Sequence, residues 1–422
     1  MERKLSALVL VCFTVFGAVC SNAAAQALTL DKCLAEAAEN NPDLAAAREA
    51  LHKARFHYQS AYSTFLPQVS VGVSRGRSGS ESAETPNDAN SVGVSANQSL
   101  YNGGRDRAAV EEADAVREVT EWELRILEAQ LTYSTCDAFA RLLFAQESIA
   151  VTEVIAKRRQ DNVNLLQLRY EGGREHKGSL LRMVAASRQA DFDVVAAHRN
   201  VQVARRRLAR LLGRSESDAV AEGQLEVVTP GVVTNWSALV AQTPDHRLAL
   251  AQVRASKAGV VQARGRFRPS LSANASAGRG GESWPPNNDD WSVGLSMSFP
   301  VFSGGADYLN VKSAQAEQRR TEASARSKDD ELAYVLEQAY ADFCNATDNV
   351  KVQQNFLEAA TTRAEIARSQ YTSGQLSFDN WDLIENDLIN AQKSHLASRR
   401  DAVIAAANWE KAQGRSRLAK GE

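Results

Sequence analysis

The chain carries one pattern of landmark residues twice, about 200 residues apart. Two prolines recur after 202 residues, and four glycine or tyrosine landmarks recur after 201. The recurring landmarks are Pro42/Pro244, Pro67/Pro269, Gly103-Gly104/Gly304-Gly305, Tyr170/Tyr371, Gly173/Gly374 and Gly213/Gly414. A period of this length is far longer than a solenoid repeat, so the sequence predicts two copies of one domain-sized unit. We place the units at 28–213 and 235–414, with a linker at 214–234 and a tail at 415–422.

Each unit contains one stretch of alternating apolar and small polar residues, which predicts a β-hairpin. The hairpins are expected at 67–101, with a polar loop at 75–90, and at 269–302. In the second hairpin, the returning arm alternates Trp291, Val293, Leu295, Met297 and Phe299 with glycine and serine. The arms have about the length that crosses a bilayer when tilted, and aromatic residues flank them. We therefore predict membrane-crossing strands with one apolar face.

Long helices are expected to form nearly all the rest of each unit. Residues 106–170 and 306–371 contain no proline or glycine, and each helix would span about 100 Å. A helix at 34–65, capped by Asp31, is expected before the first hairpin. Helices at 179–212 and 378–413 follow short turns and must fold back antiparallel.

The first long helix carries a stripe of small and medium residues at intervals of three and four, which favours close helix packing. The stripe consists of Leu127, Leu131, Ser134, Ala138, Leu142, Ala145, Ile149, Thr152 and Ala156. The linker alternates at 225–228, which predicts one short strand there.

Residues 1–27 have the features of a secretory leader: a basic start, an apolar run and two possible small-x-small cleavage sites. Val19 precedes Cys20, where a lipid-anchor signal would have glycine or alanine, so lipidation is not expected. Outside the leader, the cysteines are Cys33, Cys136 and Cys344. Their number is odd and their spacing unlike a metal site, so we expect small packing residues. No later stretch approaches eighteen apolar residues, and no spanning helix is predicted.

No pattern in the chain predicts catalysis, a cofactor or a metal site. The only close histidine pair, His52 and His57, is more typical of a helix surface, and no nucleophile elbow, phosphate loop or zinc signature occurs. The net charge of −2 gives no bias toward nucleic acid. The basic run at 205–207 is typical of a solvated face near a helix C-terminus.

Several short phrases, duplicated and in order, resemble the outer membrane efflux family, the TolC-like proteins. They include Phe65-Leu66-Pro67, Leu100-Tyr101-Asn102-Gly103-Gly104, Arg169-Tyr170-Glu171-Gly172-Gly173, Phe299-Pro300-Val301-Phe302-Ser303-Gly304-Gly305 and Gln370-Tyr371-Thr372-Ser373-Gly374. The resemblance implies a mainly helical trimer with a small β part. Four strands per chain would form a twelve-stranded barrel in the outer membrane, and the helices a periplasmic tunnel.

The residues themselves support part of this assembly. Four strands cannot close a barrel, and open strand edges are not tolerated in lipid, so several chains must combine. Two, three or four chains would all give an even strand count. The number three comes from the resemblance alone.

The resemblance also assigns roles to the two helical tips, which would face the inner membrane. Candidate contacts to a periplasmic adaptor are Gly172, Gly173, Arg174, Gly374 and Gln375; alternatively, the glycines only turn the chain. A pore constriction is expected at Tyr371, Asp379 and Asp382. The two carboxylates lie three apart, as an acidic ring that favours cations or, equally, as a solvated first helical turn.

The function implied is a passive exit duct of the outer membrane. It would serve an inner-membrane RND or ABC transporter in tripartite efflux or type I secretion, with most of the chain in the periplasm of a Gram-negative bacterium. The alternative is a structural periplasmic coiled-coil protein that bridges partners without a pore. Bilayer-length alternating strands distinguish the two, because a bridging protein does not need them.

Overall fold

The structure is a computed structural model that describes residues 27–78, 87–215 and 218–418. The predicted leader, with Cys12 and Cys20, lies outside these residues except for its last position. The middle of the polar loop expected at 75–90 and the end of the tail also lie outside them. The described cysteines are free; Cys33 and Cys136 are buried and Cys344 is half-buried.

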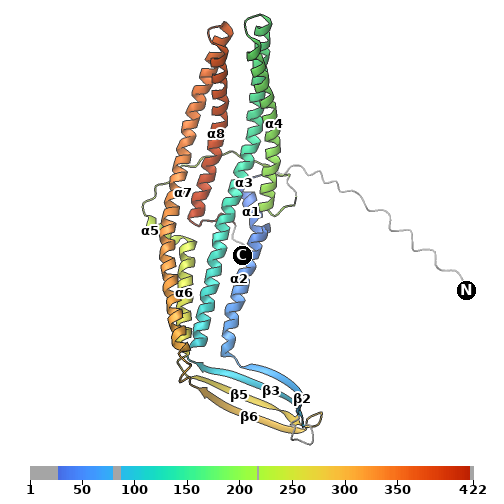
Figure 1. Ribbon diagram of the computed structural model, residues 1–422, viewed down its shortest axis with the longest axis vertical. Helices are drawn as coiled ribbons and strands as arrows, with labels where there is room; N and C mark the ends of the chain where they lie inside the picture. The colour runs from blue at the N-terminus through green and yellow to red at the C-terminus, as the bar shows by residue number, and fades with distance from the viewer. Residues whose placement is uncertain (1–26, 79–86, 216–217, 419–422) are drawn as a thin grey trace, which may run out of the picture.

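The helices form an elongated layer that is four helices wide and one helix thick (Figure 1). Two long helices, α3 (Arg105–Glu171) and α7 (Ala306–Ser373), run through its whole length. In the half next to the tips, α4 (Lys177–Leu211) packs on α3, α3 on α8 (Phe378–Ala412), and α8 on α7. In the other half, the order is α2 (Pro42–Ala61), α3, α6 (Pro244–Gly265) and α7. α7 is therefore an edge of the layer throughout.

The helix expected at 34–65 is wrong, because the chain breaks at Asn41. α1 (Leu30–Asn40) ends there and α2 begins at Pro42. The Asn41 side chain accepts hydrogen bonds from the amides of Asp43 and Leu44, both at 3.0 Å. Asp31 lies in the first turn of α1 and does not cap it. The second unit breaks in the same way between α5 (Trp236–Gln242) and α6.

The stripe predicted on α3 is confirmed. Its nine residues are all buried or half-buried, and Ala138 and Leu142 are fully enclosed. None of the helices within the described ranges is both long enough and apolar enough to traverse a membrane.

One antiparallel sheet stands at the far end of the layer from the tips (Figure 1). Its strands are β2 (Gln68–Ser78), β3 (Asn87–Asn102), β5 (Ser270–Gly281) and β6 (Asn288–Ser298), in the order β2-β3-β5-β6. The strands extend into the ends of the loop expected at 75–90, because Arg75 pairs with Asn90 and Gly76 with Ala89. β2 and β6 are the open edges of the sheet.

The two faces of the sheet differ sharply in chemistry. On one face, the side chains of Val71, Trp291, Val293 and Leu295 are each between 72% and 78% exposed. On the other face, serines are cross-strand partners along a row that spans all four strands: Ser70, Ser95, Ser276 and Ser292. The predicted alternation is thus confirmed, and no helix in the described part of the chain covers the apolar face.

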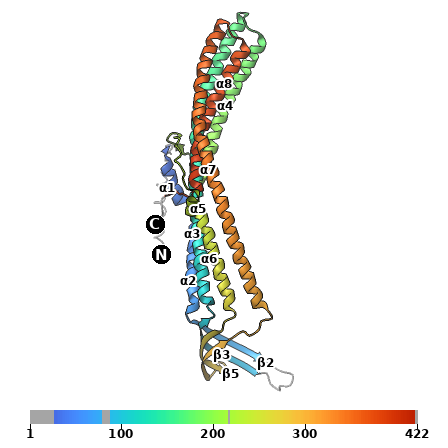
Figure 2. The same ribbon diagram turned by 90° about the vertical axis from the view of Figure 1, so that its left-hand side faces the viewer.

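A second, smaller layer lies on one side of the helices at mid-length (Figure 2). It contains α1 and a two-stranded parallel pairing of β1 (Ala27–Leu28) with β4 (Val220–Ala221). The linker strand is therefore at 220–221 and not at 225–228 as expected. Leu225 is buried in the core that joins this layer to α3, so its alternation reflects burial and not pairing.

Candidate functional site: the helical tips

Two glycine turns close the helical tips. Gly173 has φ 69° and Gly374 has φ 82°, a left-handed conformation that glycine adopts without strain. Gly172, at φ −77°, has no such requirement. All three glycines are exposed, and so are Arg174 and Gln375. The five candidate adaptor contacts therefore lie together on the free end of the molecule.

Tyr371 connects the two tips. Its ring stacks on Trp381 of α8, with centroids 4.3 Å apart and planes at 7°. Its hydroxyl donates a hydrogen bond to Glu175, in the turn between α3 and α4, at 2.8 Å. The Arg169 guanidinium lies over the ring, 4.5 Å from its centroid, and donates to the Tyr371 carbonyl at 2.7 Å. The tyrosine is therefore held by both units.

The pKa values of this pair shift in opposite directions. Burial, with the neighbouring Glu175, raises the pKa of the Tyr371 hydroxyl, which therefore stays protonated and donates. Burial alone would raise the pKa of Glu175. The hydrogen bonds from Tyr371, the His176 amide and Ser179 outweigh it and leave that pKa below its usual range.

A buried ionic network lies one turn farther along α8. The Glu385 side chain is 0% exposed and accepts two bonds from Arg158, at 2.7 and 2.9 Å, and one from Asn162 at 3.2 Å. Asp382 is paired with Arg182 at 2.9 Å and with Arg159 at 3.4 Å. These contacts fasten α8 of the second unit to α3 and α4 of the first.

The three residues predicted for the constriction occupy different environments in the single chain. Tyr371 is 1% exposed, the Asp382 side chain 4%, and the Asp379 side chain 85%. A solvated first turn is therefore the wrong interpretation for Asp382, whose two arginine partners bury it. Asp379 has an arginine, Arg182, at the longer distance of 3.9 Å. Within the described tip, Asp379 is therefore the solvent-exposed one of the two carboxylates.

Sequence reasoning missed Trp381, Glu385 and their partners. The available signal was an acidic residue at 385 within an apolar helical face formed by Trp381, Ile384 and Leu388. A carboxylate at such a position is almost always paired. Its partners on α3 lie more than 220 residues away in the chain, and no local pattern identifies them.

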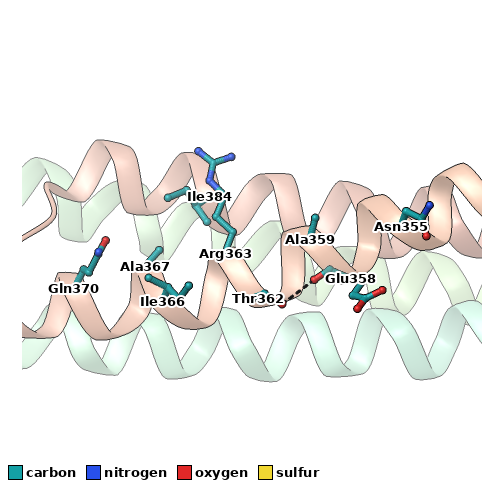
Figure 3. Close-up of a pocket in the computed structure, with 9 residues that line it drawn as sticks. All are labelled: Asn355, Glu358, Ala359, Thr362, Arg363, Ile366, Ala367, Gln370 and Ile384. Atoms are coloured by element: carbon teal, nitrogen blue, oxygen red, sulfur yellow. Dashed lines mark hydrogen bonds between the residues drawn. The ribbon is translucent and has the colours of Figure 1, made fainter.

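A groove of about 600 Å³ follows α7 near the tip (Figure 3). Ala359, Arg363, Ile366 and Gln370 line it from α7, at intervals of three and four residues, and Ile384 lines it from α8. Ile366 is 54% exposed. The groove is on the edge of the layer, where α7 lacks a second helical neighbour in the described chain.

Comparisons with known proteins cover most of the chain. The alkaline protease secretion protein AprF of Pseudomonas aeruginosa is 23% identical over 91% of this chain and 82% of its own length. The outer membrane efflux protein BepC of Brucella suis is 20% identical over 94% and 88%.

Solved structures show the same fold. The outer membrane protein VceC of Vibrio cholerae superposes with a TM-score of 0.80 at 20% identity, over 92% of this chain and 96% of its own. The MtrE channel of Neisseria gonorrhoeae gives 0.81 at 21% identity, over 91% and 88%.

The family comparison decides the assignment. The profile described as outer membrane efflux protein matches residues 33–214 and again 236–415, one match for each unit. The chain therefore belongs to the outer membrane efflux protein family: it is an efflux channel of the outer membrane whose large helical part lies in the periplasm.

Proposed function

We propose that three copies of this chain close edge to edge into one passive duct, which a periplasmic adaptor connects to an inner-membrane RND or ABC transporter. The observation that carries the proposal is that both the helical layer and the sheet have two open edges. β2 and α4 form one edge and β6 and α7 the other, so the edges of one copy complement those of the next. Such a head-to-tail interface is heterologous, and it forms a ring when the rotation closes.

The sheet supports a barrel in the outer membrane. In hydrocarbon, the unpaired backbone groups of β2 and β6 need partners, and the edges of neighbouring copies supply them. Three sheets then give twelve strands. The exposed apolar face would contact lipid and the serine row would line the interior, as in transmembrane β-barrels. A bridging protein without a pore would leave this apolar face unexplained.

The helical edges support the same closure. The free side of α4 carries Leu181, Phe192 and Val195, which are 57%, 57% and 47% exposed. On α7, Phe356 and Ile366 are 61% and 54% exposed. At 100° per residue, the three α4 residues lie within about 60° of one another around their helix, and the two α7 residues within about 80° around theirs. Phe192 is 15 residues from the tip end of α4 (192−177) and Phe356 17 from that of α7 (373−356), so the rings stand at similar heights.

At the tips, we assign Gly172, Gly173, Arg174, Gly374 and Gln375 to the adaptor contact. They are exposed at the end of the layer opposite the sheet (Figure 1).

The constriction belongs to Asp379, which would point into the pore, with Tyr371 and Asp382 fixing α8 behind it. An Asp379→Ala variant should lower the cation selectivity of single channels. Asp387→Ala, which removes a carboxylate lower on α8, is the control. Unchanged conductance and selectivity in Asp379→Ala would contradict the hypothesis of an acidic ring in the pore.

The duct is tested by combining Phe192→Cys with Phe356→Cys. Oxidation should cross-link copies into dimers and trimers and no larger species. The purified protein should also conduct ions in planar bilayers. Each single variant is the control, because it offers only one of the two thiols. Cross-linking that ends at dimers or continues beyond trimers, or a protein recovered only as a soluble monomer, contradicts the proposal.

A further inference from the structure

A cavity of about 520 Å³ lies between α3, α4 and α8, near the middle of the helical layer. Phe144, Ser148 and Val151 of α3 line it, with Val203 of α4 and Leu396 of α8 on its two sides. Val203 is 69% exposed, although its side chain is apolar. The volume is in the range of pockets that hold small molecules, and eight of the sixteen lining residues are apolar, the others being polar or charged.

Positive charge gathers at the end of the cavity that is nearer the sheet. Arg141 and Arg207 share one carboxylate, the buried Asp137, through Nε–Oδ1 at 2.8 Å and Nη2–Oδ2 at 2.5 Å. Two guanidinium groups on one carboxylate leave a net positive charge. Their side chains are 45% and 52% exposed, and each guanidinium has five N–H donors. Donors therefore remain for an incoming anion.

The remaining charges frame the apolar part. Arg400 of α8 lies over the Phe144 ring, 4.4 Å from its centroid, and pairs with Asp401 beside it. At the other end, Lys393 of α8 bridges to Asp193 of α4 at 2.8 Å. An occupant with its charged group toward Arg207 would thus place its body on Phe144.

The geometry of the ring decides which way the cavity faces. On α3, Gln146 points about 160° away from the centre of the cavity face, at 100° per residue. Its side chain binds the Ala221 amide and carbonyl at 3.0 and 3.2 Å, so the smaller layer covers the opposite side. Twelve helices at spacings of about 9 Å enclose a lumen of roughly 24 Å. Three extra layers, each about 10 Å thick, would fill that lumen, so they lie outside and the cavity faces inward.

We infer that this cavity binds an anionic amphiphile on the inner wall of the duct: a compact apolar body that carries one carboxylate. The inference rests on the proposed trimer for its inward orientation. The carboxylate would accept hydrogen bonds from Arg207 and Arg141, and the apolar body would lie between Phe144, Val151 and Leu396. Cargo of this class would bind transiently to the inner wall of the duct, because Asp137 alone does not neutralise the charge of the two arginines.

The probe for the experiment is 2-naphthoate, with naphthalene-2-methanol as its uncharged counterpart. Binding to the full chain in lipid nanodiscs is measured by calorimetry against empty nanodiscs. We expect saturable binding of one 2-naphthoate per chain. Arg207→Gln and Arg400→Gln should each weaken it at least tenfold, since each removes a charge at the cavity. Arg207→Gln leaves Asp137 paired with Arg141, so the fold is retained.

The matched control is Arg206→Gln, which removes the same charge from the neighbouring position of α4. Arg206 donates to the Ser215 carbonyl and does not line the cavity. Equal loss in the Arg206 variant, or equal binding of naphthalene-2-methanol, would overturn the inference. Conducting trimers without saturable 2-naphthoate binding would overturn it and leave the duct intact. Binding without conducting trimers would overturn the duct and the inward orientation together.

Discussion

At the scale of single residues, the hydroxyl of Tyr371 joins the two units through Glu175. Tyr371→Phe keeps the stack on Trp381 and removes the hydrogen bond to Glu175, which should cost about 1 kcal/mol locally. Amide hydrogen exchange should speed up at the tip turn around 172–176. Tyr170→Phe, which alters an exposed ring one position from Glu171, should leave exchange unchanged.

The same contact has a defined pH dependence. The folded-state pKa of Glu175 is lowered, so its contribution is present above the ordinary glutamate pKa and is lost as the pH falls through the depressed value. The difference in exchange between wild type and Tyr371→Phe should therefore persist at neutral pH and vanish in acid below the usual glutamate range. A difference that stayed constant down to pH 2 would show that Glu175 is not the partner.

Glu385 should be far more sensitive than the carboxylates at the surface. Glu385→Ala would leave Arg158 without its two-bond partner inside the helix layer, and breaking such a buried pair costs about 3 to 5 kcal/mol. Asp387→Ala, which breaks an exposed pair with Arg363, should cost less than about 1 kcal/mol. Thermal unfolding followed by circular dichroism compares them. Similar midpoints for the two variants would contradict the buried network.

The turns could be predicted from the sequence, but the network could not. Gly173 lies two residues after α3 and Gly374 directly after α7, and their positive φ is the reason glycine stands there. Asp382 looked like a solvated first-turn residue because its partners, Arg159 and Arg182, lie at least 200 residues earlier in the chain. Burial of a charge depends on tertiary partners, and helical periodicity carries no information about them.

At the scale of elements, the break between α1 and α2 is set by one side chain. Asn41 caps two amides of α2 and also donates to the Leu211 carbonyl of α4 at 2.9 Å, with only 3% of its surface exposed. Asn41→Ala should cost about 1 to 2 kcal/mol. Asn235→Ala, which removes the exposed cap of α5, should cost clearly less. Urea unfolding of both variants checks the order, and the reverse order would count against the role of Asn41.

That break illustrates how local signals compete. Asn41-Pro42 is a helix-start signal, but the apolar periodicity continues through it and predicts one uninterrupted helix. The strands were underestimated for a related reason. Residues 75–78 and 87–90 are polar or small, typical of a loop, yet pairing between β2 and β3 continues through them. Interstrand hydrogen bonds do not require apolar side chains, so composition alone places the strand ends too early.

At the scale of the whole molecule, the two faces of the sheet should respond differently to charge. Leu295→Arg puts a cation on the apolar face, 72% exposed here, and should cost about 2 to 4 kcal/mol in the membrane. Ser296→Arg puts it on the opposite face and should assemble, with altered ion selectivity. The two variants are compared by measuring how much protein folds into lipid vesicles and then the conductance of the folded channels. Equal tolerance of both variants would mean that the apolar face does not meet lipid.

Because the layer is one helix thick, we expect its stability to depend on closure of the trimeric ring. The exposed apolar residues of α4 and α7 have no partner within the described chain. Phe192→Glu should therefore shift the protein toward monomers, and Phe356→Glu should do the same. Combining Phe192→Glu with Phe356→Lys should restore part of the trimer, because the new charges face each other between neighbouring copies. Val154→Glu, which alters an exposed valine of α3 inside the layer, should leave the trimer intact. Sedimentation in detergent measures each state. If the double variant dissociates further than either single variant, α4 and α7 do not meet, and the ring closes along other surfaces.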